Sequence, residues 1–288
     1  MTSGFHFMAI SLDLIPFQRN ARLPQRPVNR QPRSPAIAGF SGLLLVGVIL
    51  GTLAGRSIAA QSAEARFAAL IFSKTSGFRH DSIPQGIAAI EALGAEHGFA
   101  VETTEDAAGF TDAALARYRV IEFLNTTGDI LDAGQKAAFE RYIRSGGGFV
   151  GVHSASDTDY RWPWYGRLVG AYFASHPAIQ RATIRIENAS HQSMQGLPVT
   201  WERTDEWYNF RDNPRSAVRV LATLDESTYS GGTMGTDHPI AWCQRIDGGR
   251  SWYTAMGHTA ESYAEPLFRL HLLGGIESAA GFAGSCGG

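Results

Sequence analysis

The sequence predicts an α/β protein with a flavodoxin-like or Rossmann-like fold: a three-layer sandwich in which helices cover both faces of a mainly parallel central sheet. Two observations lead to this prediction. Apolar runs of strand length alternate with helix-like segments between residues 66 and 153. The connections between them are short, which implies right-handed crossovers between parallel strands. The chain has 288 residues, of which 44 % are hydrophobic, and is therefore large enough to bury a sizeable core.

The first strand–helix–strand unit shows the pattern clearly. Residues 66–73 form a continuous apolar run, which is typical of a strand buried on both faces. Residues 81–98 follow as a helix, with Ser82 and Gln85 at the spacing of a capping box. Residues 99–104 are expected to form the second strand.

The alternation then continues with a short helical turn and a full helix. Thr111 and Asp132 precede these two segments as expected N-caps. The glycines at 146–148 end the second helix, where a left-handed backbone is favourable for glycine. The expected elements are a turn at 112–118, a strand at 119–125, a helix at 133–145 and a strand at 148–153.

The second half of the chain departs from this regular alternation. Beyond residue 180 it consists of strand-like runs and loops, and a helix at 265–276 closes the domain with Pro266 in its first turn. No repeat or linker interrupts residues 65–280, so we expect one domain there. Residues 281–288 form a glycine-rich tail.

Residues 1–60 have the composition of a targeting segment. They contain six Arg and one Asp, and a charge-free apolar run occupies residues 36–55. The small residues Ser57 and Ala59 suit a signal-peptidase site, so a cleaved signal peptide is favoured. An uncleaved membrane anchor is the alternative, because the run is about long enough to span a bilayer. Either interpretation predicts an exported protein, periplasmic or extracellular, that meets the membrane only through this segment.

The rest of the chain is mildly acidic and contains both cysteines. The whole chain has a net charge of −2, and residues 1–60 contribute +5, so residues 61–288 carry −7. This negative charge argues against nucleic acid as a partner. Cys243 lies in an apolar strand-like run and Cys286 in the tail. Export would allow a disulfide between them, but a buried thiol and a separate tail thiol are the favoured expectation.

Polar side chains follow two strands of the predicted parallel sheet. Arg79 and His80 come after the first strand, and His153, Asp157 and Tyr160 come at the end of the fourth. Because the carboxyl ends of parallel strands meet at one edge of a sheet, we expect His80 and His153 to approach one another there. Ligands of open α/β sheets bind at this edge.

Three later segments combine histidines, carboxylates and aromatics. His176 stands before a proline, the run "TDEWYNF" supplies Glu206, Trp207 and Tyr208, and His258 follows an apolar strand and a glycine. Sugar rings present both apolar faces and hydroxyls, so surfaces that mix aromatic and polar side chains suit them. A small-molecule sugar or oligosaccharide is therefore the expected ligand.

Long motifs in the chain resemble the ThuA-like domain family over about residues 66–280. They are "GFRHDSI", "GGGFVGVHSASDTDYRWPWYGRLVGAYFASHP", "DEWYNF" and "HPIAWCQRIDGGRSWYTAMGHTAESYAEPLFRLHLLGGI". The resemblance implies a fold similar to class I glutamine amidotransferases and a role in trehalose utilisation and other carbohydrate metabolism. In those amidotransferases the elbow after the strand reads Gly-x-Cys-x-Gly, whereas here it reads Gly151-Val152-His153-Ser154-Ala155. Glutamine hydrolysis through a thiol is excluded at this position, since imidazole cannot form the thioester.

The first functional hypothesis is a lyase or hydrolase acting on a sugar, keto-sugar or uronide. His153 and His258 would move protons, with Tyr208 and Glu206 as their partners, because imidazole titrates near neutral pH. β-Elimination suits such a set, and Arg79 would orient an anionic or oxidised substrate. The other expected substrate-binding residues are His80, Asp157, Tyr160, Trp164, His176 and Trp207.

A metal-assisted version of this hypothesis adds a divalent ion such as Zn²⁺. Three protein ligands and an open position for water would make a catalytic zinc site. The local H-x-x-x-H spacing is absent, so the ligands would come from separate loops. The candidates are His80, His153, His176 and His258, with a carboxylate from Asp157 or Glu206.

Two alternatives remain open. Ser154 could act as a nucleophile with His258 as its base, although it stands one residue past the elbow position. A protein of another class, a non-catalytic carbohydrate-binding or scaffold domain, could keep the fold without the chemistry. Its working residues would then be the aromatics Trp162, Trp164, Trp207 and Tyr208.

Overall fold

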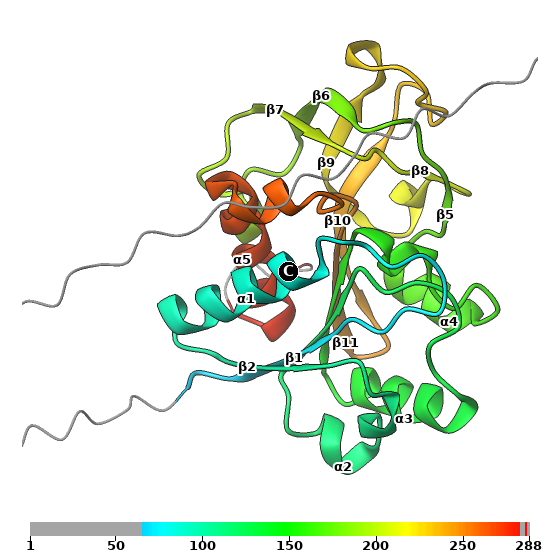
Figure 1. Cartoon of the computed structure of the whole chain (residues 1–288), viewed down its shortest axis with the longest axis vertical. Coiled ribbons are helices and arrows are strands. Elements are labelled where there is room, and N and C mark those ends of the chain that lie inside the picture. The colour runs from blue at the N-terminus through cyan, green and yellow to red at the C-terminus, as the bar shows by residue number, and fades with distance from the viewer. Residues whose placement is uncertain (1–64, 283–285, 287–288) are drawn as a thin grey trace, which may run out of the picture. The chain divides into compact units, whose positions relative to one another are not determined.

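A nine-stranded sheet between two layers of helices forms the centre of the protein. A computed structural model describes residues 65–282 and Cys286. The strand order is β2-β1-β3-β4-β11-β10-β9-β6-β7. Helices α1 and α5 pack on one face of the sheet, and α3 and α4 lie on the other (Figure 1). The α/β three-layer fold predicted from the sequence is confirmed.

One half of the sheet is parallel and carries the order β2-β1-β3-β4-β11, the 2-1-3-4-5 order of flavodoxin-like folds. In register, Phe72 lies opposite Phe123, and Val152 lies opposite both Leu124 and Thr254. The residues that follow these strands therefore emerge at a single edge. The strands are β1 (Ala68–Phe72), β2 (Ala100–Thr104), β3 (Val120–Leu124), β4 (Gly148–Val152) and β11 (Gly249–Thr254).

The other half of the sheet is antiparallel. Strand β11 joins the two halves, since it pairs parallel with β4 and antiparallel with β10. Strand β7 ends at Asp205, and the chain then runs on to a small separate sheet of β5 and β8. The strands are β5 (Phe173–Ser175), β6 (Gln180–Ile186), β7 (Thr200–Asp205), β8 (Asn209–Phe210), β9 (Arg219–Asp225) and β10 (Pro239–Ile246).

The helical layers bury the apolar faces of the strands. Phe123 of β3 stacks on Phe139 of α3 with 5.3 Å between ring centroids, and also on Tyr165 of α4 at 5.7 Å. Such aromatic pairs stabilise beyond the area they bury. The helices are α1 (Ile83–His97), α2 (Asp112–Leu115), α3 (Ala133–Arg144), α4 (Pro163–Val169) and α5 (Pro266–Ala280).

Two of the three expected helix caps are confirmed and one is wrong. Asp132 and Gln135 form a complete capping box at α3, and the Thr111 side chain accepts from the amide of Ala114. Ser82 makes no such bond at α1. Its hydroxyl instead accepts from Asn125 Nδ2 at 3.0 Å, which ties the start of α1 to the end of β3. Helix α5 also extends four residues beyond the expected end at 276.

The expectation of two free thiols is wrong, because Cys243 and Cys286 form a disulfide. Cys286 lies against β10, where its Cα is 5.8 Å from that of Cys243, within the usual range for a bridge. Cys286 is buried there. The bridge joins the C-terminal tail to the sheet across 43 residues of sequence.

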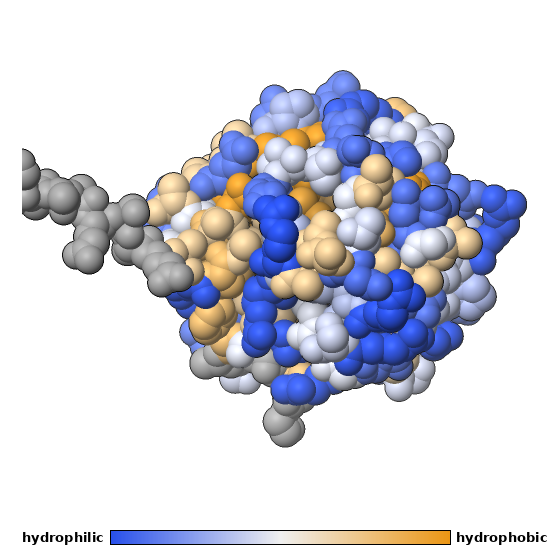
Figure 2. Space-filling view, turned by 90° about the horizontal axis from the view of Figure 1, so that it is seen from below, coloured by the Kyte–Doolittle hydropathy of each residue, from blue (hydrophilic) through white to orange (hydrophobic). Residues whose placement is uncertain are grey.

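The expected targeting or anchoring segment, residues 36–55, lies outside the described residues. Within 65–282, no helix has both the length and the apolar character that a membrane crossing requires. Hydrophilic residues dominate the face shown in Figure 2, with apolar residues scattered between them. The exposed large apolar side chains of the described part are Phe78, Ile179, Val199 and Leu270.

Candidate functional site

A cavity of about 330 Å³ opens at the carboxyl edge of the parallel half. Residues from several separate loops line it, as expected where parallel strands end together. The lining combines three aromatic rings with three histidines and two carboxylates. These residues are Phe78, His80, Asp157, Phe173, His176, Glu206, Tyr208 and His258.

His153 lies beneath this cavity, directly after β4, in an unusual backbone conformation. Its φ of 49° is in the left-handed region, which is strained for a non-glycine residue. A sharp strand-to-helix turn of this kind is the nucleophile-elbow geometry. The His153 Nδ1 lies 2.8 Å from the Ala255 carbonyl oxygen, and because a carbonyl only accepts, Nδ1 carries the proton. The lone pair of neutral His153 is therefore on Nε2.

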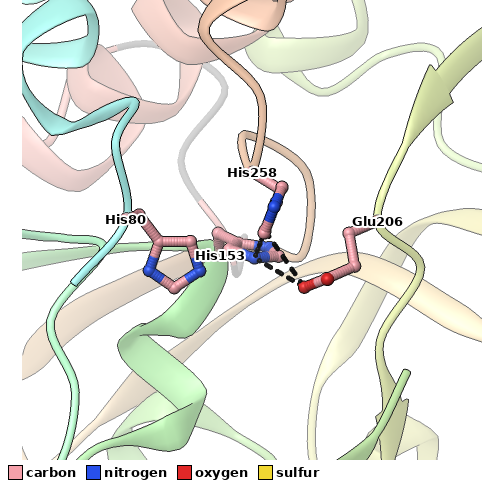
Figure 3. A group of neighbouring side chains, drawn as sticks. All are labelled: His80, His153, Glu206 and His258. Carbon is pink, nitrogen blue, oxygen red and sulfur yellow. Dashed lines mark hydrogen bonds and ion pairs between the residues drawn. The ribbon is translucent and has the colours of Figure 1, made fainter. Parts of the chain in front are cut away.

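The side chains of His258 and Glu206 converge at that Nε2 atom (Figure 3). It lies 3.1 Å from His258 Nδ1 and 3.4 Å from Glu206 Oε2. The His258 Nδ1 is 3.0 Å from the same Glu206 oxygen. The three groups come from the end of β4, the loop after β11 and the segment after β7. His153 and His258, which are 105 residues apart in the sequence, thus lie within hydrogen-bonding distance of each other.

The loop that carries His258 is held by its backbone. The Asp205 carboxylate accepts from the amides of Gly257 at 2.9 Å and His258 at 3.1 Å. The Gly257 carbonyl accepts from Asn125 Nδ2 at 3.2 Å and from the Tyr263 hydroxyl at 2.9 Å. Gly257 has a φ of 107°, which other residues rarely adopt. These bonds determine where the His258 imidazole lies.

The electrostatics of the cluster follow from burial and pairing. Burial, the largest influence, raises the pKa of Glu206, but its bonds and charge interactions with His153 and His258 outweigh burial and hold that pKa well below 4.5. Burial lowers the pKa of His258, but the Glu206 carboxylate outweighs it, so the pKa of His258 is raised above 6.5. Glu206 and His258 accordingly behave as an ion pair at the floor of the cavity.

His80 completes the group from the loop after β1. Its ring centroid is 4.9 Å from those of both His153 and His258, and its Nδ1 lies 3.4 Å from Ser154 Oγ. Burial first, and then the neighbouring histidines, lower the pKa of His80 to about 2. The predicted approach of His80 and His153 at one edge of the sheet is therefore what the structure shows.

The cavity is also lined by His176, Tyr208 and Asp157. The His176 Nδ1 is 2.9 Å from Glu206 Oε1, the carboxylate oxygen that faces away from His153 and His258. The Tyr208 ring packs on the imidazole of His153 with centroids 4.1 Å apart. Asp157 accepts a hydrogen bond of 2.5 Å from the hydroxyl of Tyr160, so Tyr160 adjoins the cavity through this carboxylate.

Four expected residues do not reach the cavity. Trp207 is fully buried with its Nε1 bonded to the Gln180 carbonyl, and Trp164 is buried with its Nε1 on Asp247. Both belong to the core, which corrects the expectation that they bind substrate. Arg79 is exposed and pairs with Glu105 at 2.6 Å, so it orients nothing in the cavity. Ser154 is fully buried, with its hydroxyl toward His80 rather than His258.

Several residues that shape the site were not predicted from the sequence. His238 bonds the Tyr208 carbonyl through Nε2 at 2.8 Å and Glu226 through Nδ1 at 2.8 Å, and so fixes the tyrosine beside His153. Its His-Pro context, the same as that of His176, was the available signal. Phe78, two residues before His80, and Phe173 line the cavity as apolar walls.

The fold and this site define an α/β protein of the class I glutamine amidotransferase-like type, with histidine at the elbow. A family model described as ThuA, trehalose utilisation, matches residues 68–279, and the chain belongs to that family.

Solved structures agree with this assignment. The chain is similar to a ThuA-like protein from Bacteroides uniformis, with 26 % identity and a TM-score of 0.65 over 75 % of this chain and 91 % of that one. A ThuA-like protein from Parabacteroides merdae shares the fold, with 20 % identity and a TM-score of 0.63 over 77 % and 92 % of the two chains. A search of curated proteins finds no match.

Proposed function

We propose that this ThuA-family protein is a lyase or hydrolase that converts a sugar in the cavity above His153. The observation that carries the proposal is the convergence of His80, His153, His258 and Glu206 at the floor of a cavity with aromatic walls. Titratable groups that perturb one another inside a cavity are the usual mark of a catalytic site. Trehalose utilisation, the description of the family, supports a sugar as substrate.

The lining favours a neutral keto-sugar over a uronide. Asp157 and Glu206 contribute carboxylates to the cavity, and its lining residues include neither Arg nor Lys. An anionic substrate would meet these two carboxylates, and the His258 imidazolium is already paired with one of them, Glu206. Arg79, the cation expected for that purpose, is paired with Glu105 outside the cavity.

β-Elimination from a keto-sugar fits the groups present. A base removes the proton on the carbon next to the carbonyl, and the electron pair forms a carbon–carbon double bond as the β carbon–oxygen bond breaks. The departing oxygen takes a proton, so the reaction needs no oxidant or reductant. His153, His258 and Glu206 supply base and acid groups within reach of one another.

Aromatic side chains would hold the sugar ring. Phe78 is 66 % exposed at the cavity, although burial of so large an apolar ring is normally favourable. Phe173 and Tyr208 line the same space. A sugar ring stacked on Phe78 would cover this surface, which gives the exposed ring a role.

We also propose that the protein acts outside the cytoplasm. The Arg-rich start and the apolar run at 36–55 have the pattern of an export signal. The Cys243–Cys286 disulfide is compatible with an oxidising compartment.

The test is turnover of keto-disaccharides by the full chain, compared with the parent disaccharides and with uronides, and followed by the products formed. We expect turnover of the keto-sugars alone. The His153→Asn variant should lose turnover and retain sugar affinity, because asparagine tolerates a left-handed backbone but has no imidazole. Equal turnover by the variant would overturn the catalytic role of the cluster.

Sugar affinity separates catalysis from simple binding. The Phe78→Ala variant should bind the sugar about tenfold more weakly, because the stacking surface is lost. Val199→Ala, which removes apolar surface from an exposed residue outside the cavity lining, is the matched control. Sugar binding that depends on Phe78 without turnover of any sugar would identify a non-catalytic carbohydrate-binding domain instead.

A further inference from the structure

We propose that His153, His258 and Glu206, together with His80, bind one divalent transition-metal ion, for which Zn²⁺ is the best-suited candidate. All four residues offer a ligand atom, and these atoms lie within 4.8 Å of one another. Of the candidates expected from the sequence, Glu206 supplies the carboxylate, whereas His176 and Asp157 are not part of the group.

The distances among the three closest donor atoms fit a shared ion. Zinc bonds to nitrogen and carboxylate oxygen are about 2.1 Å long, which places neighbouring ligand atoms about 3.0 Å apart in octahedral and about 3.4 Å apart in tetrahedral geometry. The observed separations among His153 Nε2, His258 Nδ1 and Glu206 Oε2 are 3.1, 3.4 and 3.0 Å. All three separations fall in this range.

The hydrogen-bonding roles of the donors point the same way. His153 directs a lone pair from Nε2 into the cluster, because its Nδ1 proton is committed to the Ala255 carbonyl. Glu206 is an acceptor when ionised. Without an ion, the one proton at His258 Nδ1 is shared between two acceptors, His153 Nε2 and Glu206 Oε2. A cation between the three atoms would instead accept a lone pair from each of them.

The surrounding groups have the arrangement of an outer ligand shell. Metal-binding histidines generally donate their other ring proton to a carbonyl or carboxylate, as His153 does to Ala255. The second oxygen of Glu206 is 2.9 Å from His176 Nδ1, which would orient this carboxylate. His80, with its ring 4.9 Å from both other imidazoles, stands where a fourth ligand would be needed.

A second group of metal-ligating residues in the described part of the chain is less suitable. His191 lies near Cys243 and Cys286, but the two sulfurs are bonded to each other. Metal binding requires thiolates, which a disulfide does not provide.

The inference concerns the same site as the proposed function and rests on it only for the role of the ion in a reaction. Three nitrogens and one oxygen favour a transition metal over Mg²⁺ or Ca²⁺, which prefer oxygen ligands. The cavity lies next to the ligand atoms, so the oxygen atoms of a sugar carbonyl and hydroxyl could take further coordination positions. The ion would polarise that carbonyl as a Lewis acid.

The test is metal binding by the full chain, purified without a histidine tag, stripped with a chelator and titrated with Zn²⁺ alone. We expect one tightly bound ion per chain by calorimetry and elemental analysis. Glu206→Gln should weaken binding by at least tenfold, since it removes a charged ligand at nearly constant shape. His97→Ala, which removes an exposed histidine at the end of α1, should bind Zn²⁺ as the wild type does.

His258→Gln is a second ligand variant, in case Glu206→Gln fails to fold. Absorption of bound Co²⁺ in the visible range should show nitrogen–oxygen ligation in the wild type and disappear in this variant. Failure of the wild type to bind, or equal binding by both ligand variants, would overturn the metal site. Turnover retained after chelation would overturn its catalytic role and leave the proposed function standing. Tight Zn²⁺ binding without turnover of any sugar would overturn the proposed function and leave the metal site standing.

Discussion

Two groups of histidines in the described part of the chain differ in their surroundings. His191, and His271 of α5, bond neutral groups through both ring nitrogens: three serine or threonine hydroxyls, one carbonyl and the Ser193 amide, at 2.9–3.2 Å. His80, His153 and His258 instead crowd one another and the carboxylate of Glu206 beside a cavity. The first group has its hydrogen bonds completed within the core, which is a structural role. In the second group, nitrogen and oxygen atoms that can offer lone pairs converge beside the cavity, as proton transfer or metal binding requires.

The largest effect should separate turnover from stability. His153→Asn is expected to lower kcat/KM by about 10² to 10⁴-fold, the usual contribution of a positioned acid or base. The free energy of unfolding should change little, because asparagine accepts the φ of 49° at this position. Steady-state kinetics and urea unfolding check both parts. A large loss of stability with normal turnover would place His153 in the structural group.

The next effect is the converse, at His271. His271→Ala should lower the free energy of unfolding by about 2 to 4 kcal/mol, because it leaves a cavity and removes the bonds to Ser193 and Thr254. Turnover per folded molecule should remain that of the wild type. Impaired turnover in fully folded variant protein would contradict the division into two groups.

The same variant reports on protonation. Burial lowers the pKa of His271 to about 3, below its value of 6.5 when unfolded. The unfolded chain therefore binds a proton that the folded chain does not, and stability is lost as the pH falls below 6.5. Between pH 7 and pH 5 the wild type should lose about 2 kcal/mol more than His271→Ala. Parallel pH profiles for the two proteins would show that His271 titrates normally.

Glu122 should show an effect of similar size and opposite sign. It is fully buried on β3, and its carboxyl oxygens have no hydrogen-bond partner among the described residues. Burial raises its pKa to about 8 from 4.5, so the folded state binds the extra proton between these values. Its stabilising contribution is present below pH 4.5 and lost as the pH rises to 8. From pH 7 to pH 5, the wild type should gain about 2 to 3 kcal/mol relative to Glu122→Gln. Identical profiles would refute the shift.

The smallest effect concerns the loop that positions His258. Gly257→Ala should cost on the order of 1 kcal/mol, because alanine disfavours a φ of 107° and its Cβ would lie 2.9 Å from the Tyr263 hydroxyl oxygen. Turnover should also fall, since the displaced loop moves His258. Gly109→Ala, where a Cβ meets nothing within 4 Å, is the control. Equal behaviour of the two variants would show that the loop adapts.

The sequence by itself determined the parallel half of the fold and part of the site. Alternating apolar runs and caps such as Asp132 with Gln135 are local signals, so strands and helices could be identified with ends within a few residues. His80 and His153 could be paired because strand topology alone brings the ends of β1 and β4 to one edge.

Only the tertiary structure decided which of the remaining polar and aromatic residues face the cavity. Trp207 and Tyr208 are neighbours in sequence, yet Trp207 is bonded to Gln180 in the core while Tyr208 lines the cavity. The pairing of Cys243 with Cys286 depended likewise on where Cys286 lies in the folded chain. The physical reason is that strand period and capping are local properties, whereas a side chain's direction depends on contacts with residues distant in the sequence. The meeting of His258 with Glu206 across the junction of the two sheet halves is the clearest case.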